Sequence, residues 1–365
     1  MSPPNTIAVA LGTRPEIIKL APIIRLLGDR ARVVHTGQHY DESLSKVFFD
    51  AFELSEPTHR LEIGGETRAT QIGEATTRIG LYLAEQPAAA LVAQGDTNTT
   101  VGAALAANAT GTPLIHIEAG LRSFDRRMPE EHNRVVTDVL SDLCCAPTEV
   151  SRQNLLDGGI PAERIAVTGN TVVEAVQTLL PTERGPHLER HAVAPGGYLL
   201  ATFHRPENVD DPETLGVILR ELADLELPTI LPMHPRTRAR VESFGLGTLL
   251  GKLRVIEPVG FQEFLALSAE CAALVSDSGG VQEEVSVLKR PVLVVRRSTE
   301  RPEVIGTFAE RVLPGPDIGR IVGGWLADLP ALHARLATIP SPYGEGDAAA
   351  RSVEAINRLL DGGPE

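Results

Sequence analysis

Short apolar runs alternate with stretches of helical periodicity along the first half of the chain. Residues 6–11 form an apolar run, and between residues 15 and 27 apolar side chains recur at the spacing of a helix. Pro15 suits the first position of that helix, so the chain opens as strand, turn and helix. The same pattern predicts strands at residues 32–36, 88–94 and 113–117, with helices at residues 99–108 and 133–140.

The second half of the chain repeats this alternation. We predict strands at residues 198–202, 229–232, 273–275 and 291–295. Strands that alternate with helices form parallel sheets, so the pattern indicates an α/β protein with two such sheets. The polar stretch 181–197 is rich in proline and glycine and is predicted to be a linker. We therefore expect an N-terminal domain at residues 1–180 and a C-terminal domain at residues 198–347.

Polar or charged residues follow almost every predicted strand. In open parallel sheets, ligands bind outside the carboxyl ends of the strands. Two such edges that face one another would line a cleft from both domains. The polar ends that this reasoning selects lie at residues 12–14, 37–39, 95–97, 118–120, 204–206, 234–236 and 276–280.

Composition and charge narrow the class of protein. A chain of 365 residues corresponds to two domains at roughly 150 residues each. Hydrophobic residues make up 42% and charged residues 22%, which excludes disorder as the main state. A net charge of -14 disfavours a protein that binds nucleic acid through an overall basic field.

The cysteines and the N-terminal segment indicate a cytoplasmic protein. Cys144, Cys145 and Cys271 cannot form a disulfide framework, and the absence of a CxxC pair disfavours a thiolate zinc site. The first residues lack the basic and apolar regions of a signal peptide. No run reaches the ~18 apolar residues of a membrane helix, so we expect no membrane association.

The segment SDSGGVQEE at residues 276–284 carries the strongest chemical signal. It follows a predicted strand and opens a helix, where free backbone N–H groups favour an anion, and Gly279 and Gly280 allow a close approach. The alternative is a tight turn without a ligand. No P-loop lysine follows it, and no GxGxxG follows the first strand, which disfavours an NAD-dependent dehydrogenase.

A second helix start, at residues 12–16, carries cations. Arg14 and Lys19 could reach a phosphate or a substrate oxygen. Alternatively, Arg14 pairs with Glu16 at the surface. In the loop that follows the last predicted strand, Arg301 is another candidate anion ligand, and its alternative is a solvated salt bridge.

Carboxylates at the strand ends suggest acid–base chemistry. Asp96 and Glu118 follow predicted strands, and Glu130 and Glu131 precede a predicted helix. Each could be a cap, a turn former or a complement to a helix dipole. Three acids at one edge of a sheet favour a pair of carboxylates in opposite protonation states.

Histidines add candidate cations and a weaker metal hypothesis. His204 and His234 lie at strand ends of the second half, each close to an arginine. His35, His39, His116 and Asp96 could hold a metal, but no HExxH or similar spacing is present. We therefore predict no metal and no cofactor.

Taken together, these motifs resemble those of the UDP-N-acetylglucosamine 2-epimerase family along nearly the whole chain. Their number, order and spacing carry the resemblance. The motifs are GTRPEIIKLAP (12–22), TGQHYD (36–41), GDTNTT (95–100), HIEAGLRS (116–123), MPEEHNR (128–134), TGNTVVE (168–174), FHRPENV (203–209), MHPRT (233–237), SDSGGVQEE (276–284), STERPE (298–303) and PYGEGDAA (342–349).

The resemblance implies a GT-B-like fold of two Rossmann-like domains facing across a cleft. A C-terminal helix at residues 348–360 would pack back on the first domain. The implied reaction eliminates UDP from UDP-GlcNAc to give 2-acetamidoglucal and adds UDP back to give UDP-ManNAc. The partner would be a UDP-sugar, and we expect a homodimer.

Site residues follow from the resemblance by matching positions. Asp96, Glu118 and Glu130 would be the acid–base residues, and His204 would act at the leaving diphosphate. The residues implied to bind substrate are Arg14, Ser278, Gly279 and Gly280 at the diphosphate, Glu284 at the ribose, Phe261 near the uracil, and Lys19, Arg134 and Arg301 as further candidates.

The chain departs from the family pattern between residues 38 and 72. Many allosterically regulated bacterial members read TAQHR, Met, Leu where this chain reads TGQHYDESL, so the effector segment does not match. Hydrolysing relatives that release ManNAc and UDP share most of the motifs and remain the first alternative. Glycosyl transfer on the same fold is the second alternative, and three site carboxylates argue against it.

Overall fold

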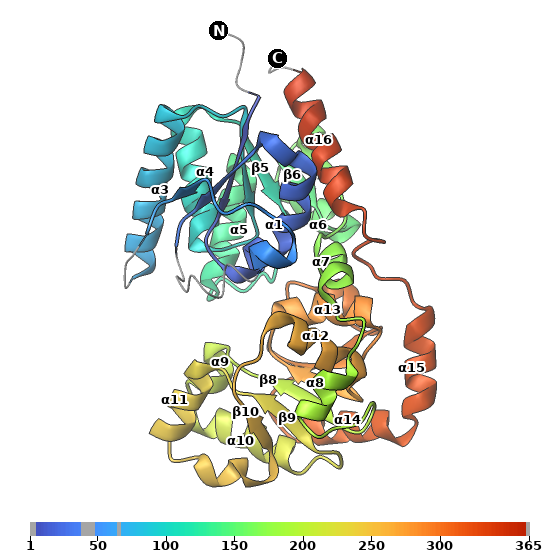
Figure 1. Cartoon of the computed structure of the whole chain (residues 1–365). Helices are drawn as coiled ribbons and strands as arrows, with labels where there is room; N and C mark the ends of the chain where they lie inside the picture. Colours follow the sequence, from blue (N-terminus) through green and yellow to red (C-terminus); the bar gives the residue numbers. More distant parts are fainter. Residues whose placement is uncertain (1–4, 38–47, 64–66, 363–365) are drawn as a thin grey trace. The chain divides into compact units, whose positions relative to one another are not determined.

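The computed structural model describes residues 5–37, 48–63 and 67–362. Two compact units make up the chain. Unit 1 comprises Met1–Thr178 and Tyr343–Glu365, and unit 2 comprises Leu179–Pro342. Each is built around one parallel sheet with helices on it (Figure 1).

Unit 1 contains a seven-stranded sheet in the order β3-β2-β1-β4-β5-β6-β7, and every pair of neighbours is parallel. Its strands are β1 (Ile7–Leu11), β2 (Ala31–His35), β3 (His59–Arg60), β4 (Ala90–Gln94), β5 (Leu114–Ile117), β6 (Leu143–Ala146) and β7 (Ile165–Val167). Its α-helices are α1 (Arg14–Leu27), α3 (Arg68–Glu85), α4 (Asn98–Thr110), α5 (Pro129–Leu140), α6 (Glu149–Asp157), α7 (Val172–Leu179) and α16 (Ala348–Gly362).

Unit 2 contains a six-stranded parallel sheet in the order β10-β9-β8-β11-β12-β13. Its strands are β8 (Leu199–Thr202), β9 (Thr229–Pro232), β10 (Arg254–Ile256), β11 (Ala273–Ser276), β12 (Val292–Val295) and β13 (Ala309–Val312). Its α-helices are α8 (Gly185–Arg190), α9 (Pro206–Val209), α10 (Pro212–Ala223), α11 (Pro235–Ser243), α12 (Phe261–Glu270), α13 (Gly279–Leu288), α14 (Asp317–Ala327) and α15 (Leu329–Thr338).

Both sheets reverse their strand order at one point. In unit 1 the reversal lies between β1 and β4, and in unit 2 it lies between β8 and β11. Loops leave such a switch point in opposite directions and open a crevice at the carboxyl ends of the strands, where ligands bind in this class of fold. The segments that leave the two switch points are residues 12–13, 95–97, 203–205 and 277–278.

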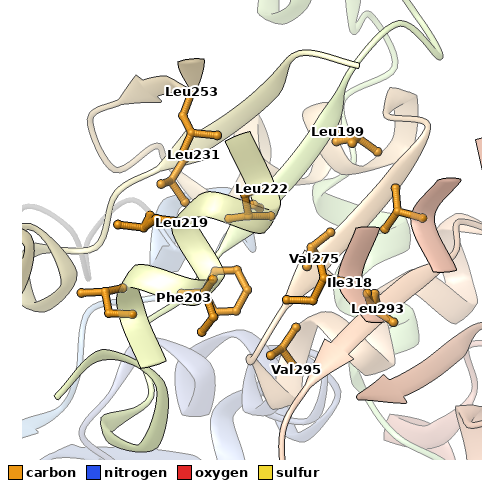
Figure 2. Close-up of a cluster of buried hydrophobic side chains, with 14 of the residues drawn as sticks. Leu199, Phe203, Leu219, Leu222, Leu231, Leu253, Val275, Leu293, Val295 and Ile318 are labelled. Atoms are coloured by element: carbon orange, nitrogen blue, oxygen red, sulfur yellow. The ribbon is translucent and has the colours of Figure 1, made fainter. Parts of the chain in front are cut away.

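The core of unit 2 explains why its strands are continuous apolar runs. Phe203, Val275 and Leu293 point from the sheet and its loops toward Leu222 on α10 and Ile318 on α14 (Figure 2). A parallel sheet covered by helices buries both faces, so its strands do not alternate apolar and polar residues.

The α/β fold with two parallel sheets confirms the prediction from the sequence. One helix start was wrong, because α5 begins at Pro129 and not at residue 133. Pro129 in the first turn lets the helix begin there, and Glu130 and Glu131 lie inside that turn instead of before it. Residues 181–197, predicted as a linker, contain α8.

Two further expectations concern membrane-spanning helices and the segment in which the chain departs from its family pattern. No helix within the described ranges is long and apolar enough to span a bilayer. His39, with residues 38–47 and 64–66 of the segment where the chain departs from its family pattern, lies outside the described residues.

Candidate functional site

Glu118 sits at the centre of a buried polar cluster in unit 1. It follows β5 with a φ of 67°, a backbone conformation that a non-glycine residue adopts only at some cost. Its Oε2 accepts hydrogen bonds from Lys19 Nζ, from Gln94 Nε2 at 3.1 Å and from Asn170 Nδ2 at 3.3 Å. Helix α1, the end of β4 and the turn after β7 thus supply donors that stabilise the carboxylate.

Asp96 follows β4 and is paired with Arg134 on α5. Its Oδ2 accepts from Arg134 Nε at 2.9 Å and from Nη2 at 2.6 Å. Arg134 also donates to Glu131 Oε2 at 2.7 Å, and its side chain is almost fully buried. The Asp96 side chain remains 29% exposed. Asp96 is therefore accessible yet fixed by a buried cation, and the substrate-binding role of Arg134 stays a prediction.

The first turn of α5 separates the two neighbouring glutamates. Glu131 is buried and accepts from the backbone N–H groups of Ser123 and Phe124 at 2.9 and 3.1 Å. Glu130 is only partly buried. Glu131 thus anchors the loop before α5, whereas Glu130 stays available as an acid–base candidate.

Glu16 turns inward and ties two loops of the switch point together. It accepts from Gly12 N at 3.0 Å and Thr13 N at 2.8 Å at the start of α1, and from Thr97 Oγ1 at 2.8 Å after β4. Burial raises the pKa of Glu16, although hydrogen bonds from Thr97 and Thr13 oppose the shift. Arg14 is exposed and Glu16 is buried, so a surface pair between them was a wrong alternative.

In unit 2, buried Asp277 organises the loop that carries His204. It accepts from the backbone N–H of Arg205 at 3.0 Å and from Asn208 Nδ2 at 3.1 Å, and His204 Nδ1 lies 3.3 Å from its Oδ1. Burial by itself would raise the pKa of Asp277, but the hydrogen bond and charge of His204 and the other donors lower it below its usual range. His204 is therefore oriented through Nδ1 at the end of β8.

The start of α13 has the features of an anion site. Ser278 is the residue before the helix, and Gly279 and Gly280 form its first turn. A Cβ at Gly279 would lie 2.8 Å from Glu300 Oε1 and 3.4 Å from Arg301 Nη1, so a larger residue there would have to displace the Glu300 carboxyl group. Four N–H groups at a helix start have no partner within the helix, and together with the helix dipole they favour a phosphate.

Arg301 belongs to a buried network of ion pairs and not to a solvated one. Its Nε donates to Glu283 Oε1 at 2.8 Å and its Nη1 lies 2.6 Å from Glu300 Oε1. Arg296 donates to the other oxygen of Glu300 at 3.0 Å. The network joins the loop after β12 to α13, which holds that loop against the glycine turn. The alternative of a solvated pair was therefore wrong.

The remaining candidates lie at two places. Glu284 is buried in α13, with Oε1 at 3.5 Å from the position of a Cβ on Gly280, and partly buried Phe261 begins α12.

The histidines of the metal hypothesis have hydrogen-bond partners within the protein. His116 contacts Asp138 and a backbone carbonyl, and His35 accepts from Gly37 N at 3.1 Å. Within the described part of the chain, no group of three or more metal-binding side chains occurs.

Comparison with known proteins gives the family. The family model described as UDP-N-acetylglucosamine 2-epimerase matches residues 28–357. A UDP-N-acetylglucosamine 2-epimerase of Methanocaldococcus jannaschii is 39% identical over 368 residues, which cover 97% of this chain and 98% of that relative. This chain belongs to the UDP-N-acetylglucosamine 2-epimerase family. It is an enzyme of the epimerase class, as the sequence predicted.

A further relative and a solved structure extend the comparison. A UDP-2,3-diacetamido-2,3-dideoxy-D-glucuronate 2-epimerase of Pseudomonas aeruginosa is 35% identical over 363 residues, covering 97% of this chain and 99% of that one. A crystal structure of the Methanocaldococcus jannaschii UDP-GlcNAc 2-epimerase in complex with UDP-GlcNAc and UDP has a TM-score of 0.85 at 37% identity. That alignment covers 97% of this chain and 100% of the other.

Sequence reasoning missed several residues that shape the candidate site. Gln94 is the last residue of β4, and Asn170 lies in TGNTVVE, a motif that carried no assigned role. Asp277 lies within SDSGG, but only the neighbouring serine and glycines of that motif were predicted to bind phosphate. The signal for all three was their position just at or after the end of a strand. Their partners lie 24 to 73 residues away in the chain and could not be read from spacing.

Proposed function

We propose that this epimerase interconverts UDP-GlcNAc and UDP-ManNAc without net hydrolysis. The family supports epimerisation, and the relative solved in complex with UDP-GlcNAc and UDP supports a UDP-sugar as the substrate. Membership of an epimerase family argues against the alternative of glycosyl transfer. A homodimer and a cytoplasmic location remain predictions.

The chemistry requires a route around an unactivated C–H bond. C2 of the sugar has no neighbouring carbonyl, so its proton cannot leave through an enolate. In the proposed reaction a base removes the C2 proton, the C1–O bond breaks, and UDP leaves with the bonding electrons. The C1=C2 bond of 2-acetamidoglucal results. UDP then adds back to C1 while C2 receives a proton on its other face.

The acid–base work falls to Asp96, Glu118 and Glu130. The observation that carries the proposal is the pair of carboxylates that follow the neighbouring strands β4 and β5 of unit 1, each fixed by its own buried cation, Arg134 or Lys19. Such cations orient the carboxylates before substrate arrives. Two independently held carboxylates suit a reaction that needs proton transfer on two faces of C2.

The leaving diphosphate is assigned to groups at the ends of strands and starts of helices. His204, oriented by Asp277, and the first turn of α13 would neutralise charge that grows as the C1–O bond breaks. Arg14, which is exposed at the start of α1, is assigned to the diphosphate by the family resemblance alone. The residues assigned to UDP are Arg14, His204, Ser278, Gly279 and Gly280, with Glu284 at the ribose, Phe261 at the uracil, and Lys19, Arg134 and Arg301 as supporting residues.

Proton NMR of UDP-GlcNAc in D2O with the enzyme tests the proposal. We expect deuterium at C2 together with the anomeric signal of a second UDP-sugar. Free ManNAc and UDP without UDP-ManNAc would move the assignment to the hydrolysing reaction. If UDP-GlcNAc shows no exchange, the experiment should be repeated with the UDP-diacetamido uronate for which one relative is named.

Two variants test the acids. We expect Asp96→Asn and Glu118→Gln to abolish C2 exchange while UDP still binds in calorimetry. Glu149→Gln is the matched control, since Glu149 is a 76% exposed carboxylate of the same unit. Near-native exchange in both site variants would remove these acids from the mechanism.

A further inference from the structure

A buried charged triad that the proposed mechanism does not use lies behind the acids of unit 1. His116 Nδ1 is 2.7 Å from Asp138 Oδ1, and His116 Nε2 is 2.8 Å from the carbonyl oxygen of Gly95. Arg122 Nη2 lies 2.7 Å from the other oxygen of Asp138. The side chains of His116 and Asp138 are fully buried, and that of Arg122 is 8% exposed.

The hydrogen-bond partners fix how many protons the triad holds. The Gly95 carbonyl can only accept, so His116 Nε2 carries a proton and donates. The short contact to Asp138 requires a second proton between Nδ1 and the carboxyl group. The guanidinium of Arg122 favours the charged carboxylate, so that proton belongs to the ring. His116 is therefore an imidazolium between a carboxylate and a carbonyl.

The triad connects the three segments that carry the candidate acids. Gly95 directly follows β4 and precedes Asp96. His116 lies in β5, two residues before Glu118. Asp138 lies on α5, the helix whose first turn contains Glu130 and which holds Arg134 against Asp96. The backbone N–H of Gly120 also approaches Asp138 Oδ1, at 3.4 Å.

We infer that His116 and Asp138 are positioning residues that hold the β4 end, the β5 end and α5 in the register needed for acid–base catalysis. The inference rests on the proposed function. His116 fixes the peptide that precedes Asp96, and Asp138 fixes α5 and the turn after Glu118. Displacement of an acid by a fraction of an ångström to an ångström weakens proton transfer far more than it weakens binding of UDP.

Amide substitutions separate the two bonds of His116. His116→Gln places an amide nitrogen near the position of Nε2 and can keep the bond to Gly95, whereas His116→Asn places it near Nδ1 and can keep only the bond to Asp138. Asp138→Asn removes the charge that holds the imidazolium. Ile79→Ala is the matched control, because Ile79 is fully buried in α3 of the same unit. Its truncation should destabilise unit 1 without removing a contact of the triad.

The measurements are kcat, KM, C2 exchange in D2O and the calorimetric Kd of UDP. We expect kcat to fall about 10- to 100-fold in Asp138→Asn and His116→Asn, with the Kd of UDP within about twofold of wild type. His116→Gln should recover part of that loss. A kcat of Asp138→Asn and His116→Asn equal to that of Ile79→Ala would overturn the inference, as would a loss confined to KM.

Nitrogen NMR of the histidine rings tests the triad independently of turnover. Near neutral pH, we expect both ring nitrogens of His116 to be protonated in the wild-type enzyme, with the signature lost in Asp138→Asn. A singly protonated ring would overturn the proton assignment. If wild-type enzyme shows no C2 exchange with any UDP-sugar tested, the proposed function fails, while the ring signature still decides whether the triad exists.

Discussion

Gly120 and Gly159 form a matched pair that isolates the effect of one steric contact near the site. Both have the left-handed backbone that favours glycine, with φ of 82° and 83°. A Cβ at Gly120 would lie 2.3 Å from the carbonyl oxygen of Ser151 and 2.8 Å from Leu155 Cγ. A Cβ at Gly159 would meet nothing within 4 Å. Alanine at the two positions therefore differs only in available space.

The magnitudes follow from that geometry. An L-residue pays about 1–2 kcal/mol in the left-handed region, and this cost applies to both variants. At Gly120 the contact is with backbone of α6, which cannot rotate away, so the helix or the turn after Glu118 must move. Overpacking of this kind costs about 1–3 kcal/mol more. We expect Gly159→Ala to lose about 1–2 kcal/mol and Gly120→Ala about 2–5 kcal/mol of unfolding free energy.

Urea unfolding followed by far-UV circular dichroism measures the two losses. The fluorescence of Trp325 reports unit 2 and serves as an internal reference, since both glycines belong to unit 1. Turnover is measured in parallel, and Gly120→Ala should also lower kcat because the displaced turn contains Glu118. Equal destabilisation of the two variants would refute the argument that the Ser151 contact dictates glycine at this turn.

Two further predictions concern buried ionisable groups. Burial, together with the charge of Arg60, lowers the pKa of His35 from 6.5 to about 4, so the unfolded chain binds this proton first and the enzyme loses stability as the pH falls from 6.5 towards 4. At pH 5 the loss of unfolding free energy is about 2 kcal/mol. In His35→Asn, the urea midpoints at pH 7 and pH 5 should therefore converge. An unchanged pH dependence of the midpoint would contradict the assignment. Burial also raises the pKa of Cys145 and of Cys271 to about 12. Iodoacetamide at neutral pH should therefore leave the native enzyme unlabelled by mass spectrometry and modify the thiols only in urea, and rapid labelling of folded enzyme would show that these thiols are accessible.

The sequence predicted the α/β class and the general location of the site, because strand periodicity and polar strand ends are local signals. It did not predict which strands are neighbours. The pairing of β1 with β4, which brings residues 12–13 and 95–97 together, depends on sheet order. Spacing alone could not reveal it.

Roles of individual charged residues were harder to predict, since they depend on which way a side chain turns. Neighbouring residues of a helix point about 100° apart, so Glu130 and Glu131 diverge once α5 begins at Pro129. Arg134 was predicted to bind substrate, but its contacts with Asp96 and Glu131 were not predicted. The pair of Arg134 with Asp96 joins residues 38 positions apart in the chain, which local sequence pattern cannot predict.

Helix α16 has a consequence for how the chain is made. It packs against α1 and β6 in unit 1 (Figure 1), and its residues are the last of the described chain to leave a ribosome. Unit 2 is one continuous segment, whereas unit 1 also needs residues 343–362, which are made after unit 2. Ser352 and Ile356 of α16 are buried in unit 1, so its core cannot be complete before they are made. During synthesis unit 2 can therefore finish folding first, and the apolar surface of unit 1 that α16 covers stays open to chaperones until residues 343–362 have been made.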